Sequence, residues 1–298
     1  MRNERDPLPA TLPPALSPLM VQDAVRAALR EDLGLAGDVT SDATIPAEAT
    51  AVAVLNCREE GVLAGLSLAR AAFAAIDPAA EFHAHMEDGQ SLNAGTDVAT
   101  IKGKARAILA AERVALNFLC HLSGIASYTA QFANKITHTD AQVCCTRKTI
   151  PGLRAFEKYA VRCGGGSNHR YGLDDAILIK DNHIAVAGGV REAIVAARAY
   201  AGHLTKIEVE VDTLDQLAIA LEAEPDVVML DNMSPETLRE GVAMVSRAQR
   251  PIPVEASGNV NIDTITAIAE TGVDYISTSK ITMSAPTLDL GLDIRIDG

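Results

Sequence analysis

A repeated alternation of strand and helix segments, beginning at Gln142, constrains the fold of this chain more than any other feature. The predicted strands are Val143–Thr146, Ala176–Lys180, Lys206–Val211, Asp226–Leu230, Ile252–Ala256 and Tyr275–Ser279. The predicted helices are Gly189–Tyr200, Leu214–Glu222, Pro235–Arg247 and Asp263–Glu270. Alternation of this kind predicts a parallel sheet flanked by helices, as in β/α barrels. Roughly six or seven strands are fewer than the eight that close a regular barrel, so we expect an incomplete, open barrel.

The N-terminal half has a mixed order of elements, which indicates a separate α+β region. Residues 1–16 are rich in proline and charge and are predicted to form a disordered arm. Helices are predicted over 17–32 and 67–76, and strands over 49–55, 81–86, 97–102 and 105–109. A long helix is predicted from about Ala110 to Ile136, with Val114, Phe118, Leu122 and Ile125 on one apolar stripe. A chain of 298 residues is therefore expected to form two domains.

Every predicted strand of the C-terminal half ends in a polar residue. These residues are Arg147 with Lys148, Lys180, Glu210, Asp231, Ser257 and Ser279. The carboxyl ends of parallel strands meet at one edge of the sheet, where β/α barrels carry their catalytic groups. The pattern therefore predicts a functional site built from these strand ends.

The distribution of charge indicates an anionic ligand. The formal net charge of the chain is −13, yet the stretch from Thr146 to His183 is basic. Its cationic residues are Arg147, Lys148, Arg154, Lys158, Arg162, Arg170 and Lys180, accompanied by His169 and His183. The glycine-rich segment Cys163–Ser167 lies between the two strand ends of this stretch and is predicted to be a loop. A local group of cations beside such a loop suits a small, multiply charged anion better than a polyanion.

Acidic residues lie beside these cations in the predicted strands. Glu208, Glu210 and Asp212 share one face of the strand 206–211, and Asp231 ends the following apolar run. Carboxylates inside a barrel need cations, a metal ion or a polyol as partners. The structural alternative is that these acids only form ion pairs with cations of the basic stretch.

A serine–glycine turn is a candidate phosphate site. Ser257 and Gly258 follow a predicted strand and precede the helix expected at Asp263, so backbone N–H groups and the helix N-terminus would face an anion. Ser279, at the end of the last strand, could add a hydroxyl group. An ordinary turn is the alternative. Neither a P-loop nor a strand-linked dinucleotide motif occurs in the sequence.

Composition argues against several other classes of protein. The acidic balance and an aromatic content of 3% argue against a nucleic-acid partner. The five cysteines have no C-x-x-C spacing, which predicts reduced thiols, a cytoplasmic location and no zinc site. The N-terminus lacks the apolar segment of a signal peptide, and no apolar run approaches membrane-spanning length, so no membrane partner is expected.

Arg113 is an isolated cation in the first turn of the predicted long helix. The helix dipole disfavours a positive charge there. A salt bridge with Glu112, or simple solvation, is the structural explanation. The functional explanation is a ligand that needs a positive charge at this position.

Several ordered motifs occur along the chain: Glu112–Leu119 with Leu122–Ala126, Thr146–Arg154, Lys158–Arg170, Ile179–His183 and Glu208–Asp212. Together they resemble the motifs of the quinolinate phosphoribosyltransferase family. The resemblance begins near Ser17 and includes Glu31–Gly34 and Asp38–Thr40. Motifs of this length in one order are specific, so chance is a poor explanation for them.

The resemblance implies a reaction and a fold. The 5-phosphoribosyl group of phosphoribosyl pyrophosphate would move to the ring nitrogen of quinolinate, with loss of pyrophosphate and of the 2-carboxylate as carbon dioxide. The product, nicotinate mononucleotide, is a precursor of NAD. The implied fold is α/β: an N-terminal α/β sandwich domain of residues 17–128 with 287–298, and an open β/α barrel of the type II phosphoribosyltransferase kind over residues 129–286.

The resemblance also assigns roles to residues of this chain. Quinolinate would be bound by Arg147, His169, Arg170 and Lys180, and by Arg113 of the partner subunit in a homodimer with a shared active site. The catalytic residues would be Glu210, Asp231 and Lys148, with Lys148 on the sugar phosphates and both acids near Mg²⁺, directly or through water. The 5′-phosphate would be held by Ser257, Gly258 and Ser279. Many family members have glycine at the position of Ser279 and histidine at that of Met283.

Three alternatives stay open from the sequence. A protein of the same fold could act on another ring acid. A Schiff-base aldolase would use Lys180 as its nucleophile, since this residue ends a barrel strand beside acids. A non-catalytic anion-binding protein would not need Glu210 and Asp231 together.

Overall fold

A computed structural model describes residues 13–295, and the chain divides there into two compact units. Within the described residues, the first unit comprises the chain up to Ala130, Ala155–Gly165, and the segment from Ala285 onward. The second unit comprises Gln131–Arg154 and Gly166–Ser284. Residues 1–12 of the predicted disordered arm lie outside the described residues. The predicted domains, 17–128 with 287–298 and 129–286, are meant as independently folding parts of the chain and remain a prediction.

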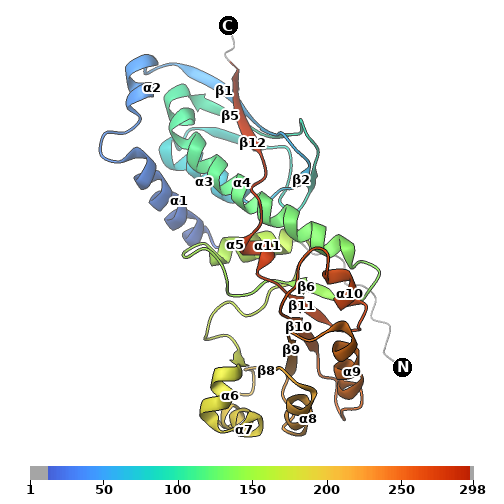
Figure 1. The fold of residues 1–298 in the computed structure, drawn as a ribbon. Helices are drawn as coiled ribbons and strands as arrows, with labels where there is room; N and C mark the ends of the chain where they lie inside the picture. Colours follow the sequence, from blue (N-terminus) through green and yellow to red (C-terminus); the bar gives the residue numbers. More distant parts are fainter. Residues whose placement is uncertain (1–12, 296–298) are drawn as a thin grey trace. The chain divides into compact units, whose positions relative to one another are not determined.

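The first unit is built on an antiparallel sheet with the strand order β12-β1-β5-β3. Its strands are β12 (Leu290–Arg295), β1 (Thr50–Cys57), β5 (Asp97–Lys104) and β3 (Glu81–Ala84). A small second sheet pairs β2 (Gly61–Val62) with β4 (Ser91–Leu92). The C-terminal strand β12 pairs with β1, so the end of the described chain returns to the first unit, as the resemblance implied (Figure 1).

Five helices belong wholly or mainly to the first unit among the described residues. They are α1 (Pro18–Leu33), α2 (Val39–Thr44), α3 (Leu66–Ile76), α4 (Ala105–Lys135) and α5 (Arg154–Cys163). The predicted helices over 17–32 and 67–76 are confirmed, while α2 and α5 were not predicted. The apolar stripe of the long helix α4 is also confirmed, because Val114, Phe118, Leu122 and Ile125 are all buried.

The predicted strand over 105–109 is wrong, since α4 begins at Ala105 directly after β5. This segment reads Ala-Arg-Ala-Ile-Leu, and alanine, arginine and leucine all favour a helix. The short alternation of its apolar residues could not distinguish a strand from a helix. Arg113 therefore lies well inside α4 rather than in its first turn, and the argument from the helix dipole does not apply to it.

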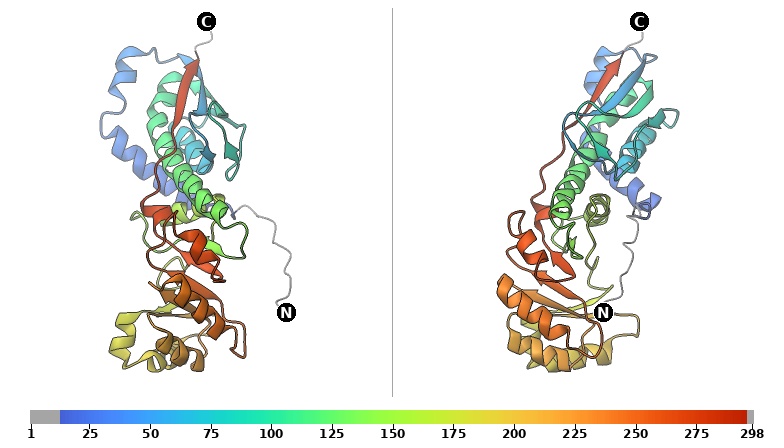
Figure 2. Two further views of the ribbon diagram at one scale, coloured as in Figure 1. Left: turned by 45° about the vertical axis from the view of Figure 1, so that its right-hand side comes forward. Right: turned by 90° about the vertical axis from the view of Figure 1, so that its right-hand side faces the viewer.

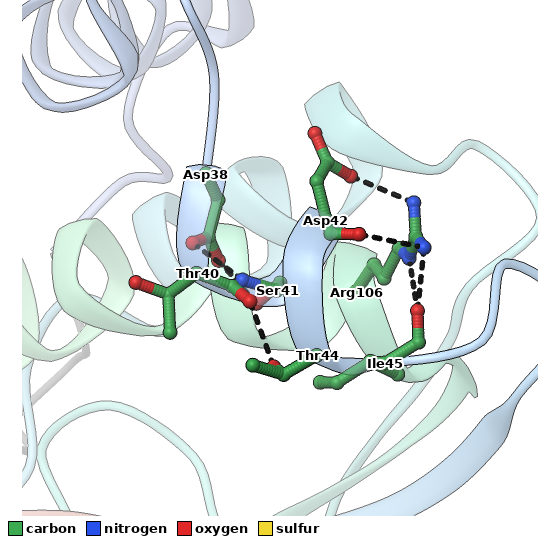
Figure 3. Close-up of polar contacts among 7 residues, drawn as sticks. All are labelled: Asp38, Thr40, Ser41, Asp42, Thr44, Ile45 and Arg106. Atoms are coloured by element: carbon green, nitrogen blue, oxygen red, sulfur yellow. Dashed lines mark hydrogen bonds and ion pairs between the residues drawn. The ribbon is translucent and has the colours of Figure 1, made fainter.

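The first turn of α4 is fixed by contacts with α2 (Figure 3). Arg106 donates from Nε to the carbonyl oxygen of Ile45 over 2.8 Å and forms an ion pair with Asp42 at 2.8 Å. Asp38 caps α2 by accepting a hydrogen bond from the backbone N–H of Ser41 over 3.0 Å. The helical position of Arg106 thus serves to hold α2.

The length and composition of α4 are also those of a membrane-crossing helix. Its most apolar 18-residue window is 56% buried inside the structure, as is common for the core helix of a soluble protein. This is weak evidence for a membrane, and the expectation of no membrane partner stays a prediction.

The second unit contains a six-stranded parallel sheet with the order β6-β11-β10-β9-β8-β7. Its strands are β6 (Gln142–Cys144), β11 (Tyr275–Ser277), β10 (Val254–Ser257), β9 (Val227–Asp231), β8 (Ile207–Val211) and β7 (Ile177–Ile179). All six predicted strands are confirmed. Within the described residues β6 and β7 remain unpaired with each other, so the barrel is open, as predicted.

Helices follow the strands of this sheet in chain order. They are α6 (Asp181–Ala187), α7 (Val190–Tyr200), α8 (Leu214–Glu222), α9 (Pro235–Val245), α10 (Ile265–Ala269) and α11 (Lys280–Met283). Neighbouring members of the series α7, α8, α9 and α10 pack against one another, which makes a row of helices along the sheet (Figure 2). The four predicted helices are confirmed; α6 and α11 were not predicted.

Gly124 of α4 makes room for the C-terminal segment that leads to β12. A Cβ atom at this position would lie 2.1 Å from the carbonyl oxygen of Pro286 and 2.9 Å from the Cα of Thr287. Both are backbone atoms, so a side chain could be accommodated only by displacing this segment. Any larger residue at 124 therefore works against the return of the chain to the first unit.

We expect Gly124→Ala to lower the free energy of unfolding by about 1–3 kcal/mol, the usual cost of forcing extra carbon into packed structure. This loss should appear although alanine favours a helix by about 1 kcal/mol over glycine. Denaturant unfolding measures the effect. Gly202→Ala is the control, because a Cβ there meets nothing within 4 Å. A Gly124→Ala protein as stable as the control would contradict this account of the segment.

Candidate active site

The candidate site is the carboxyl edge of the parallel sheet in the second unit. Glu210, Asp231 and Ser257 lie at or next to the last positions of β8, β9 and β10. Lys180 directly follows β7, and Ser279 comes two residues after β11. Arg147 and Lys148 follow β6 in the loop that leads to α5. The predicted strand-end residues are thus brought to one edge, because the strands are parallel and adjacent.

Lys180 and Glu210 form an ion pair at this edge. Lys180 Nζ lies 2.6 Å from Glu210 Oε2, a contact that follows from the pairing of Ile179 with Val209 in the neighbouring strands. The structural alternative therefore applies to Glu210 in part, since it does pair with a cation of the basic stretch. The Lys180 side chain nevertheless remains 46% exposed, which leaves it able to contact a ligand.

Asp231 and the serine–glycine turn are connected by Asn232. The Asn232 side chain donates to Asp231 Oδ2 over 2.6 Å, and its backbone N–H donates to the carbonyl oxygen of Ser257 over 2.9 Å. Gly258 has a φ of +88°, and a Cβ there would lie 2.1 Å from Asn232 Oδ1. Glycine is therefore required at 258, which explains the serine–glycine pair in structural terms.

The predicted phosphate cradle differs in one respect from the structure. Helix α10 was expected to begin at Asp263 but begins at Ile265 and contains five residues. A turn over Asn261–Thr264 separates it from Ser257. The backbone of the turn at 257–259, rather than the end of a helix, is the candidate contact for an anion.

Arg147 and Arg170 bring two guanidinium groups close together. Burial, followed by the charge of Arg147, lowers the pKa of Arg170, while Glu208 and Asp175 oppose this shift. The Nε atoms of both arginines are buried and have no hydrogen-bond partner among the described residues. Two adjacent cations with unused donors form an environment that an anion would stabilise.

The loop that carries Arg147 is braced by a third arginine. Arg154 donates to the carbonyl oxygens of Arg147 and Tyr171 over 3.2 and 3.0 Å, and to the hydroxyl of Thr149 over 3.1 Å. Thr282 of α11 holds the same loop by donating to the carbonyl oxygen of Lys148 over 2.8 Å. These contacts hold the backbone of the loop, and the Lys148 side chain is exposed.

Not every cation of the basic stretch belongs to this edge. Lys158 and Arg162 lie in α5 and belong to the first unit, where Lys158 is fully buried. Arg113 is also in the first unit, exposed on α4. The local excess of positive charge in the sequence therefore contains both site cations and cations of the core.

The glycine-rich loop connects two separate parts of the open sheet. Ser167 pairs with Cys144 of the edge strand β6. His169, two residues later, places Nε2 2.9 Å from Glu208 Oε2 of β8. The loop thereby carries Arg170 to the candidate site, and Arg170 also donates to the carbonyl oxygen of Ala176 over 3.0 Å.

Glu255 of β10 was not singled out from the sequence. Its carboxylate lies near His169 and Glu208, and the ligating atoms of the three residues lie within 4.8 Å of one another. Like Glu208, Glu255 is an acid inside an apolar strand segment, here 252–256. This sequence pattern could therefore have identified Glu255 as a candidate. Asp212, predicted on the same face as Glu208, is exposed beyond the end of β8.

The fold and this edge together define a β/α protein with a cluster of charged side chains at the carboxyl ends of its parallel strands, where enzymes of this class carry their active sites. Comparison with known proteins then identifies the family. The model of the quinolinate phosphoribosyl transferase N-terminal domain matches residues 38–123, and that of the C-terminal domain matches residues 125–293. The chain belongs to the quinolinate phosphoribosyltransferase family.

Individual relatives agree with this assignment. The probable nicotinate-nucleotide pyrophosphorylase (carboxylating) of Bacillus subtilis is 42% identical over 266 residues, which cover 89% of this chain and 90% of that protein. The nicotinate-nucleotide pyrophosphorylase (carboxylating) of Mycobacterium leprae is 41% identical, over 92% of this chain and 96% of that protein. The crystal structure of NadC from Streptococcus pyogenes superimposes with a TM-score of 0.90 and 42% identity, covering 95% of this chain and all of that one.

Proposed function

We propose that this protein transfers the 5-phosphoribosyl group from phosphoribosyl pyrophosphate to quinolinate with decarboxylation. The products are nicotinate mononucleotide, pyrophosphate and carbon dioxide, and the reaction serves NAD biosynthesis. The observation that carries the proposal is the grouping of Arg147, Arg170 and Lys180 beside Glu210 and Asp231 at one sheet edge, in a chain of this family.

The chemistry divides between these two kinds of residue. Arg147, Arg170 and Lys180 bind the carboxylates of quinolinate by charge-assisted hydrogen bonds. The ring nitrogen attacks C1 of the ribose and pyrophosphate departs with the electrons of the broken C–O bond. Glu210 and Asp231 stabilise the positive charge that develops on the ribosyl centre, as carboxylates do in glycoside cleavage. The 2-carboxylate then leaves as carbon dioxide, its electrons drawn toward the ring nitrogen that became cationic, and a proton takes its place.

The phosphate groups have their own contacts in this proposal. Ser257, Gly258 and Ser279 hold the 5′-phosphate, supported by the left-handed turn at 258 and its backbone N–H groups. Lys148 reaches the remaining phosphates of the sugar substrate. Its exposed side chain at the edge of the site supports this role.

Mg²⁺ is the metal ion that we propose for this reaction. It would neutralise the pyrophosphate, with Glu210 and Asp231 as ligands, directly or through water. The donor set fits, because each carboxylate is engaged through one oxygen, with Lys180 or with Asn232, and keeps its other oxygen. Oxygen ligands of this kind are the ones Mg²⁺ prefers.

We further propose a homodimer in which Arg113 enters the partner's active site. Arg113 is exposed on α4, which supports its contact with another subunit. A cytoplasmic location is also proposed, and it is supported by five cysteines that form no disulfide in the described part of the chain. The amine of Lys180 is engaged by Glu210 at 2.6 Å, which argues against its use as a Schiff-base nucleophile.

The direct test is product detection. Quinolinate, phosphoribosyl pyrophosphate and Mg²⁺ should yield nicotinate mononucleotide and one carbon dioxide for each pyrophosphate released. Nicotinate in place of quinolinate is the matched control, because it lacks the 2-carboxylate that would be lost. Turnover of nicotinate with no turnover of quinolinate would point to a relative acting on another ring acid.

The cationic residues should control the affinity for quinolinate. We expect Arg147→Ala, Arg170→Ala and Lys180→Ala each to raise the quinolinate KM by about tenfold or more, or to abolish turnover, because each removes a charge-assisted contact. Steady-state kinetics measure this. Arg191→Ala is the control, since Arg191 pairs with the exposed Glu222. Near-normal kinetics in all three variants would rule out the cationic pocket.

A shared active site can be tested by mixing inactive subunits. Arg113→Ala and Glu210→Ala proteins should each be inactive, and a mixture should regain part of the activity because a heterodimer holds one intact site. Subunit exchange is verified with two differently tagged chains. If exchange occurs and no activity returns, Arg113 does not act across the dimer.

The two acids should act on the ribosyl centre rather than on quinolinate. We expect Glu210→Gln and Asp231→Asn to lower kcat on the order of a hundredfold, the usual loss for one electrostatic stabiliser, with little change in quinolinate affinity. Calorimetry of quinolinate binding beside turnover separates the two effects, with Glu222→Gln as a surface control. Collapse of quinolinate binding with turnover preserved at saturation would reverse the assignment.

A further inference from the structure

Two buried carboxyl groups face each other beneath the candidate site. Glu208 of β8 is 8% exposed and Glu255 of β10 is 4% exposed, and these strands lie on either side of β9. The proposed reaction uses neither group. Burying even one carboxylate is costly without partners, so a facing pair requires a physical explanation.

His169 lies between the two carboxyl groups. Its Nε2 atom is 2.9 Å from Glu208 Oε2 and 3.8 Å from Glu255 Oε1. Its Nδ1 atom accepts the backbone N–H of Arg170 over 2.8 Å. Both ring nitrogens therefore have contacts inside the protein, which fixes the ring from two sides.

Glu255 is also held by residues of β11 and β6, which lie on the side of β10 away from Glu208. Its side chain is hydrogen-bonded by Ser277 of β11, and its Oε2 atom lies 3.9 Å from Cys144 Sγ of β6. One oxygen of each acid, Oε1, is buried without a hydrogen-bond partner among the described residues. The network thus joins four strands of the sheet to the loop that carries Arg170.

The burial of Glu255 changes its protonation equilibrium. Burial, followed by the repulsion of Glu208, raises the pKa of Glu255 to about 7, although His169 opposes the shift. A carboxyl group that carries a proton for much of the time at neutral pH does not repel its neighbour. Glu208 is the closer partner of His169, while Glu255 contributes mainly hydrogen bonding and shape.

We propose that Glu208 and Glu255 are positioning residues that hold His169, and through it the adjacent Arg170, in the orientation that binds the pyridine dicarboxylate. This inference rests on the proposed function for the identity of the ligand. The positioning of His169 does not depend on the ligand, because Glu208 and the backbone of Arg170 contact its ring within the protein. Loss of either acid should therefore disturb the dicarboxylate site and spare the phosphoribosyl pyrophosphate site.

Kinetics of four variants test this selectivity. Glu208→Gln should raise the quinolinate KM about tenfold, as expected for loss of a charge-assisted contact, with the KM for phosphoribosyl pyrophosphate changed less than about twofold. Glu255→Leu should act in the same direction. Glu255→Gln keeps the shape of a protonated acid, so its quinolinate KM should stay close to that of the wild-type protein. Glu270→Gln is the matched control, because it removes a surface contact of 3.2 Å with His138.

A second measurement does not depend on activity. In protein labelled with ¹⁵N-histidine, Glu208→Gln should shift the ring nitrogen signals of His169, identified by their absence in His169→Gln, and leave those of His138 in place. Glu270→Gln should do the reverse. An inactive wild-type protein with these shifts would refute the proposed function and leave the network intact. Unchanged His169 signals, or equal increases in both KM values together with a lower unfolding midpoint, would overturn the positioning role.

Discussion

The burial of Arg170, and the repulsion between its guanidinium group and that of Arg147, constrain the candidate site at the edge of the second unit's sheet. Burial and this repulsion lower the pKa of Arg170, and the partners that oppose the shift are Glu208 and Asp175. Neighbouring cations destabilise each other unless nearby acids offset their repulsion and the surrounding backbone supports them. The bracing of the Arg147 loop by Arg154, and of Arg170 by the carbonyl oxygen of Ala176, supplies that support.

Sheet order then sets the sequence of charges along the carboxyl edge. From β7 to β10 the strand ends present a cation, two acids and a hydroxyl in turn: Lys180, Glu210, Asp231 and Ser257. Further along, β11 leads to Ser279 and β6 to Arg147 and Lys148. In the proposed reaction, the acids for the ribosyl centre and the hydroxyl groups for the phosphate come from different strand ends along this edge. The segment Ser167–Arg170, which follows the glycine-rich loop, runs from β6 toward β8 and adds Arg170 to the cations of this edge.

Much of this unit could be predicted from the sequence, because strands buried in a parallel sheet are short apolar runs that end in polar residues. The errors of the sequence prediction, in both units, have physical causes. The segment 105–109 was too short for its alternation to outweigh its helix-forming residues, and that error also misplaced Arg113. Helix α6 begins with polar residues directly after Lys180, so it showed no apolar period. Glu255 lies in an apolar strand segment, as Glu208 does, and was overlooked; its contact with His169 depends on a distant loop and could not be predicted from that pattern.

The net charge of −13 makes the local cations essential for substrate capture. Both proposed substrates are anions, so the field of the whole protein opposes their approach. At physiological ionic strength, screening limits that field to about 8 Å, so charges within this range of the site dominate the final approach. Arg147, Arg170 and Lys180 can therefore attract an anion locally, provided that nearby acids do not cancel them. A proton on Glu255 removes one such charge from beneath the site, so the buried acid pair holds His169 at a smaller electrostatic cost to the binding of a dianion.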